Sequence, residues 1–185
     1  TSRQWALGTQ LILSDGRKFR FCLQNGSAAG VNGNVYQARV PITAHVLQTP
    51  TTAGVIGDTT LVMTIGATAI AADEDKDGYL SIELGTGRGF VFPLGAHPAY
   101  LASATTVAIP FARGLTLQVA VPTTANSVSL ISNAHYKVLL APITTRTMPA
   151  VGVLAKSLAV NTYGWIQTRG PAAVVCSGTM IVGDK

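Results

Sequence analysis

Residues 11–23 read LILSDGRKFRFCL, two apolar runs joined by a short polar segment. From Lys18 to Leu23, large apolar side chains alternate with other residues, which is the period of a strand with one buried face. Asp15 and Gly16 separate the two apolar runs, and this pair readily adopts the positive φ angles of a tight hairpin turn. The stretch therefore predicts a β-hairpin.

Similar short apolar runs, separated by Gly, Pro, Asn or Thr, continue along the chain. Further strands are predicted at 35–40, 44–47, 61–65, 79–84, 89–92, 106–109, 115–121, 127–131, 137–140, 163–168 and 172–176. One or two helical turns are predicted at 97–104, with Pro98 in the first turn. This spacing predicts an all-β fold, an antiparallel sandwich of jelly-roll type or a barrel, with at most one short helix. The length favours a single domain over residues 1–185, with an extended N-terminal arm over 1–8.

The composition is poor in charge. Only 11% of the residues are charged, against roughly 25% in a typical soluble domain, while 48% are hydrophobic. Such a chain has few groups for acid–base catalysis, metal capture or phosphate binding. We therefore expect a structural or assembly protein rather than an enzyme, with no catalytic, cofactor-binding or metal-binding residues.

The charges are unevenly distributed along the chain. The net charge is +5, and five of the eight acids lie between Asp73 and Glu83. After Glu83 the next acid is Asp184, and the cations between them occur singly. Nucleic-acid-binding proteins usually cluster their cations, so an acidic protein lattice is the expected partner and direct nucleic-acid contact is not expected. The sequence contains no run of eighteen apolar residues, so no membrane span is predicted.

Residues 73–84, DEDKDGYLSIEL, begin like an EF-hand calcium loop. Position 12 of such a loop needs a bidentate Glu, but Leu84 occupies it. The flanking segments also have the pattern of strands rather than helices. We therefore expect Asp73, Asp75 and Asp77 to form a solvated turn without bound calcium.

Other residues that could take part in catalysis or ligand binding have simpler interpretations. Residues 85–89, GTGRG, lack the GK[ST] sequence of a phosphate-binding loop and predict a hairpin turn. The three histidines are too far apart in sequence to predict a zinc pair. Cys22 and Cys176 both lie among strand-forming residues, which favours two buried free thiols over one bridge.

Tyr163 and Trp165 alternate with smaller residues and so share one face of a predicted strand. Aromatic side chains in this position usually pack in a core or at a subunit interface. A platform on which a sugar or a base stacks is the alternative.

Several segments together carry a resemblance to a known family. These are SDGRKF at 14–19, DGYL at 77–80, GTG at 85–87, HPA at 97–99 and VGVLAKSLAVNTYGWIQTRGPA at 151–172. They resemble, in order, a family of small β-rich proteins of tailed bacteriophages that are commonly encoded near the major capsid protein. The resemblance implies a capsid decoration (cement) protein of the virion, with no catalytic residues.

A member of this family would be made in the host cytoplasm and would bind the outer capsid surface, stapling neighbouring major capsid proteins. A homo-oligomer is expected, with a homotrimer favoured because decoration subunits often sit where three capsomers meet. Two alternatives stay open: a tail- or fibre-associated module that binds a receptor or glycan, and a hydrolase on a sandwich scaffold.

Overall fold

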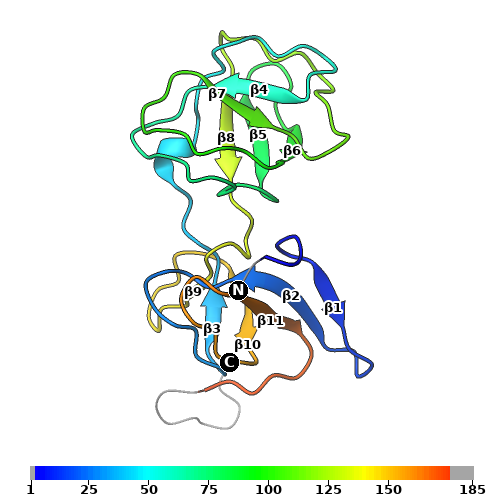
Figure 1. Ribbon diagram of the computed structural model, residues 1–185, viewed down its shortest axis with the longest axis vertical. Coiled ribbons are helices and arrows are strands. Elements are labelled where there is room, and N and C mark those ends of the chain that lie inside the picture. The colour runs from blue at the N-terminus through cyan, green and yellow to red at the C-terminus, as the bar shows by residue number, and fades with distance from the viewer. Residues whose placement is uncertain (1–2, 176–185) are drawn as a thin grey trace. The chain divides into compact units, whose positions relative to one another are not determined.

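The computed structural model describes residues 3–175 of the 185-residue chain (Figure 1). Its strands are β1 (Gln10–Ile12), β2 (Lys18–Leu23), β3 (Val35–Gln37), β4 (Thr60–Met63), β5 (Tyr79–Leu84), β6 (Val91–Pro93), β7 (Val107–Pro110), β8 (Ser127–Ile131), β9 (Leu139–Leu140), β10 (Ala150–Leu154) and β11 (Tyr163–Arg169). A single 3-10 turn, η1, spans Thr43–His45 within the described part of the chain. The sheets are antiparallel, so the predicted all-β fold class is confirmed.

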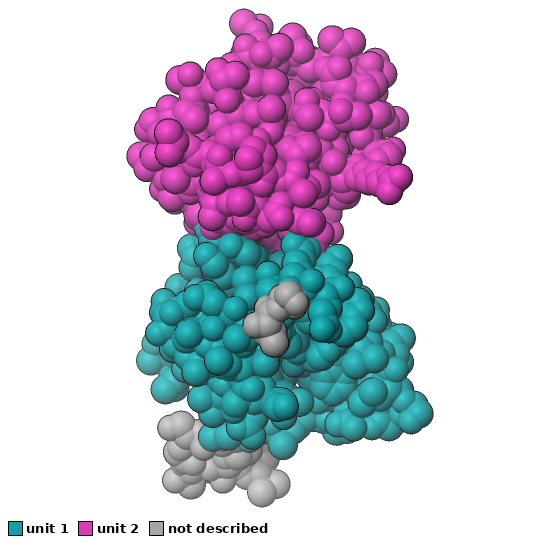
Figure 2. All heavy atoms as spheres, viewed as in Figure 1, with its two compact units in different colours: residues 1–40, 134–185 teal, residues 41–133 magenta. Residues whose placement is uncertain are grey.

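The chain forms two compact units (Figure 2). Unit 1 combines residues 1–40 with 134–185, and unit 2 is the continuous segment 41–133 between them. The sequence predicts one domain. The division was not visible in the sequence because unit 1 is assembled from the two ends of the chain.

Unit 1 is built on a six-stranded sheet in the order β1-β2-β11-β10-β3-β9. The predicted hairpin is confirmed, because β1 pairs with β2 and Gly16 in the turn has a φ of 83°. β2 then pairs with β11, which places Phe21 opposite Trp165. The ends of the chain thus supply adjacent strands of one sheet.

The two faces of this sheet bury different side chains. One apolar cluster contains Cys22, Tyr36, Val138, Leu154 and Ile166. The second cluster contains Leu7, Phe21, Leu23 and Tyr136, with Tyr163 and Trp165 packed against it. Alternation along β2 explains the split, because Phe21 and Leu23 point to the face opposite Cys22.

The N-terminal segment takes part in the second cluster. The sequence predicts an extended arm over 1–8, of which residues 1 and 2 lie outside the described part. Leu7 is instead buried, and the Trp5 ring lies 5.3 Å from that of Phe21. The described residues of this segment therefore pack on unit 1.

Unit 2 contains a three-stranded sheet, β6-β5-β8, and a two-stranded sheet, β4-β7. Its core includes Leu61, Met63, Leu80, Ile109 and Val128. Burying one such side chain stabilises the fold by about 2 kcal/mol. The predicted glycine turn at 85–89 is confirmed between the antiparallel strands β5 and β6, and all three of its glycines have positive φ.

Three local predictions are wrong. Residues 97–104 form no helix, because Tyr100 exchanges two backbone hydrogen bonds with Ile70 and is held extended. The strand predicted at 44–47 is replaced by η1 and the residues after it. Residues 115–121 form no strand, although Leu117 and Val121 make backbone hydrogen bonds to residues 54–58.

The end of the chain also differs from its prediction. Residues 172–175 are irregular rather than a returning strand, and Cys176 lies outside the described residues. The segment contacts the rest of unit 1, with Val175 N donating a hydrogen bond of 2.9 Å to Gly33 O. In contrast, β10 was not predicted at all.

Candidate functional site

The acidic turn of unit 2 is held by hydrogen bonds within the protein. Asp73 and His97 bind each other twice: His97 N donates to Asp73 Oδ1 at 3.0 Å, and Asp73 N donates to His97 O at 3.0 Å. Asp73 and Asp77 both have positive φ, of 58° and 66°, which Asp tolerates better than most residues. The turn is thus shaped by its own backbone and by its contact with His97.

Asp75 does not form part of a solvated turn, and the prediction is wrong for this residue. Asp75 is only 1% exposed, and its Oδ1 accepts a hydrogen bond of 2.6 Å from Ser132 Oγ. Its Oδ2 is buried without a hydrogen-bond partner. Glu74 is buried as well, with Oε2 accepting from Ala71 N. Sequence alternation could not reveal this burial, because residues 132 and 97 approach the turn from distant parts of the chain.

The tautomer of His97 follows from its two ring contacts. Nδ1 lies 2.8 Å from Pro98 O, which can only accept, so Nδ1 carries the proton. Nε2 accepts from Asp75 N at 3.2 Å. This tautomer satisfies both contacts and supports the turn. Within residues 3–175, no three His, Cys, Asp or Glu side chains converge so that they could hold a metal ion.

The other histidines and Cys22 are separate from this turn. His45 is buried, and its Nε2 donates to Thr68 O at 2.9 Å. Burial and the nearby Arg20 lower the pKa of His135 to about 4. Cys22 is buried and free, as predicted, and burial raises the pKa of its thiol to about 12. The prediction for Cys176 lies outside the described residues.

Four aromatic side chains of unit 1 form one contiguous group over β2 and β11: Trp5, Phe21, Tyr163 and Trp165. Phe21 stacks on Tyr163 with ring centroids 5.5 Å apart, and it meets Trp165 edge-on at 5.4 Å. The ring centroids of Trp5 and Trp165 are 5.5 Å apart, and Trp5 is 46% exposed. The prediction that Tyr163 and Trp165 share a packed face is confirmed. The partly exposed Trp5 leaves one part of the group accessible.

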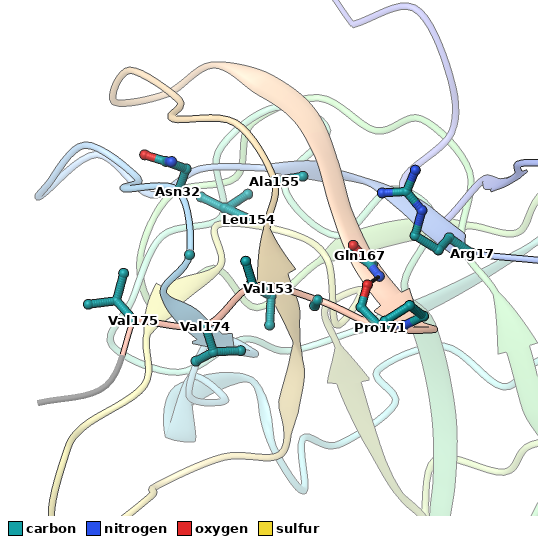
Figure 3. Close-up of a pocket in the computed structure, with 12 residues that line it drawn as sticks. Arg17, Asn32, Val153, Leu154, Ala155, Gln167, Pro171, Val174 and Val175 are labelled. Carbon is teal, nitrogen blue, oxygen red and sulfur yellow. Dashed lines mark hydrogen bonds between the residues drawn. The ribbon is translucent and has the colours of Figure 1, made fainter. Parts of the chain in front are cut away.

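Unit 1 contains several surface hollows. One cavity of about 320 Å³ is bordered by Arg17, Val153, Gln167 and residues 171–175 (Figure 3). Gln167 Nε2 already donates to Pro171 O at 2.8 Å, and Arg17 is paired with Asp15 at 2.7 Å. The lining thus offers one cation and no pair of groups for acid–base chemistry.

Charge divides sharply between the two units. Unit 1 holds ten Lys and Arg against two Asp and Glu, a net charge of +8. Unit 2 holds three Lys and Arg against six Asp and Glu, a net charge of −3. The sequence revealed the cationic second half of the chain. It did not reveal that folding combines this half with the cationic N-terminal segment.

Both units also carry exposed apolar side chains. Those of unit 1 include Leu11, Ile12, Val31, Leu140 and Ile143. Those of unit 2 include Val55, Ile56, Val91, Leu101 and Ile131. Both units therefore expose apolar surface as well as charge.

No described helix is long and apolar enough to cross a lipid bilayer. Comparison of the chain with models of protein families, with curated proteins and with solved structures found no match.

Proposed function

We propose that this chain is a structural virion protein, a decoration or cement protein. It binds the outer surface of a phage capsid and staples neighbouring major capsid proteins. The observation that carries this proposal is the charge of unit 1, net +8 with two acids. A unit of this kind is suited to binding an acidic protein surface, because complementary charge accelerates association and orients the partners.

The sequence resemblance to phage decoration proteins supports the same function. A cement protein also needs rigid binding units. Each unit here has its own buried apolar core, and the sheets are antiparallel and tightly turned. The exposed apolar residues of the two units provide additional contact area.

The proposal includes the oligomeric state and the location. A homotrimer at the local threefold axes would let one complex contact three capsomers, and closed symmetry can cover exposed sheet edges. The protein would be made in the host cytoplasm and would join the capsid from outside.

The test uses capsids assembled without this protein. Purified protein added to them should bind, and binding should weaken steeply between low and high salt because it depends on charge. Decorated capsids should also retain their DNA to a higher temperature than bare ones. If the protein does not bind, or binds without changing the temperature of DNA release, the cement function is ruled out.

A second function is favoured by one observation, the partly exposed aromatic group around Trp5 and Trp165. Such a group can stack on a sugar ring, as expected of a tail- or fibre-associated receptor-binding module. A glycan array, together with the position of the protein on tail or head in electron micrographs, distinguishes the two functions.

A further inference from the structure

We propose that the free edge of β1 binds an extended acidic segment of the capsid protein as an added strand, an inference that rests on the proposed function. Three features of unit 1 carry it: the direction of the backbone groups of β1, its exposed apolar side chains, and two paired cations on the next two strands of the sheet.

Along one edge, the backbone groups of β1 have no hydrogen-bond partner among residues 3–175. β1 is the first strand of its sheet, so β2 lies on one side only. Phe21 N donates to Thr9 O at 2.9 Å, and Leu13 N donates to Arg17 O at 3.0 Å. The backbone N–H and C=O groups of Thr9 and Leu13 therefore point toward β2. Because this direction alternates along an antiparallel pair, the N–H and C=O groups of Gln10 and Ile12 point away from β2.

The side chains of β1 leave this edge accessible. All three residues are exposed, with Leu11 at 39% and Ile12 at 58%. Exposed edges are usually blocked by charged side chains, proline or a covering segment. The β1 sequence, Gln-Leu-Ile, contains no charge and no proline. An apolar edge of this kind is suited to strand addition.

One cation lies opposite β1 on its neighbour β2, and a second lies one strand further into the sheet, on β11. Ile12 pairs with Lys18 on β2, and Lys18 pairs with Arg169 on β11. Like charges on directly paired residues repel each other. Among residues 3–175, no acidic side chain forms an ion pair with either cation. Strands lie about 4.8 Å apart, so Lys18 is about 10 Å from an added strand, within one Debye length. Acidic side chains on that strand would relieve the repulsion.

The same features decide which partner fits. Nucleic acid has neither the main-chain groups of a strand nor apolar side chains to cover Ile12. A second copy of this chain would bring its own Lys18 and Arg169 to the same edge, which places like charges together. An extended protein segment with alternating acidic and apolar side chains satisfies both the edge and the cations.

The first test uses a defined peptide, eight residues of alternating Glu and Val, added to the full-length protein. Amide chemical shifts of Gln10 and Ile12 should change, while those of β9 at the opposite edge should not. The matched Lys-Val peptide and a short DNA duplex should leave β1 unchanged. Shifts elsewhere, or equal shifts with the Lys-Val peptide or DNA, would overturn the proposal.

The second test blocks the edge. Ile12→Pro removes an outward N–H and spares the hydrogen bonds to β2, as proline does on natural edge strands. Leu140→Pro on β9 is the matched control, because Ala141 N donates to Val35 O and Leu140 therefore points its N–H outward at the other edge. Leu140 and Ile12 are similarly exposed, at 55% and 58%. Ile12→Pro should weaken peptide and capsid binding at least tenfold, and Leu140→Pro should leave both unchanged.

A charge exchange keeps the proposal testable if a proline variant does not fold. The double variant K18E/R169E lowers the net charge of unit 1 by four, as does R146E/K156E elsewhere on the unit. Only K18E/R169E should lose peptide binding by tenfold or more. Equal loss in the two variants would mean that net charge alone governs binding, and the edge would be excluded.

The outcomes separate this inference from the proposed function. If wild-type protein and Ile12→Pro bind capsids equally, the edge proposal fails while the decoration function stands. If wild-type protein binds the Glu-Val peptide at β1 but does not bind capsids, the decoration function fails, and the capsid protein is excluded as the source of the segment.

Discussion

At the scale of single residues, His135 couples the stability of unit 1 to pH. Burial and Arg20 hold its pKa near 4, against an unfolded value of 6.5. The folded state therefore binds fewer protons than the unfolded state between these values, and stability falls as the pH drops from 6.5 toward 4. The loss reaches about 3 kcal/mol, since one pKa unit is worth about 1.4 kcal/mol.

We predict that His135→Gln removes this part of the acid sensitivity. Urea unfolding at pH 7 and pH 4 measures it, and the difference between the two pH values should be smaller for the variant than for the wild type. Arg20→Gln serves as the control, because it should raise the pKa of His135 in an NMR titration. If the stability difference between pH 7 and pH 4 is as large in His135→Gln as in the wild type, the histidine is charged in the folded protein at pH 4.

Cys22 gives a prediction of opposite sign at alkaline pH. Burial raises the pKa of its thiol from 9.0 to about 12, so the folded state holds this proton longer than the unfolded state. Stability is unaffected below pH 9 and decreases as the pH rises toward 12. In a Cys176→Ser background, the native protein should react with a thiol reagent at pH 8 far more slowly than the urea-unfolded protein. Fast reaction in the native state would show that Cys22 is accessible.

At the scale of elements, the sequence predicts strands well where a simple alternation coincides with the backbone pairing. The range 79–84 matches β5 and 127–131 matches β8. The pattern fails in β10, which contains Gly152 at a φ of 150° and a shift of register beside it. It also fails at 97–104, where helix-compatible residues are held extended by one distant partner. Pairing with distant residues is not encoded in a local pattern.

The strand β11 is the element whose packing can be tested most directly. Trp165 pairs with Phe21 and contacts Trp5, so it joins β11, β2 and the N-terminal segment. Trp165→Ala should cost about 3 kcal/mol, the lower end for removing a large aromatic side chain, because Trp165 is only partly buried. Trp5→Ala should cost less, since that ring is half exposed.

Chemical denaturation measures both variants. If Trp165→Ala folds with unchanged stability and instead loses binding to a glycan, Trp165 is a ligand platform, and the receptor-binding alternative gains over the decoration function.

At the scale of the whole molecule, no candidate site could be read from a single segment. The acidic turn drew attention in the sequence, yet Asp75 is buried and Asp73 is bound to His97. The positive charge of unit 1 was less apparent, because its Lys and Arg residues come from the two ends of the chain. The contrast in charge between the units becomes visible only when the units are known. The net charge of +5 is the sum of +8 for unit 1 and −3 for unit 2.

The division into units predicts how the chain can be cut. Unit 2 is one continuous segment, 41–133, and its buried cluster draws only on residues between Leu61 and Leu130. A fragment with its own core and its own sheets should fold alone, because the apolar burial that offsets chain entropy is contained within it. Unit 1 requires both ends of the chain, since β2 pairs with β11. Residues 1–40 expressed without 134–185 should therefore stay unfolded.

Two-dimensional amide spectra measure this prediction. The 41–133 fragment should give dispersed peaks that coincide with the corresponding peaks of the full chain, and it should melt cooperatively. A variant in which a short Gly-Ser linker joins residue 40 to residue 134 tests unit 1 in the same way. Collapsed spectra for 41–133 would mean that its core needs the rest of the chain. A folded 41–133 that does not bind capsids, beside a linked unit 1 that does, would locate the proposed binding surface in unit 1.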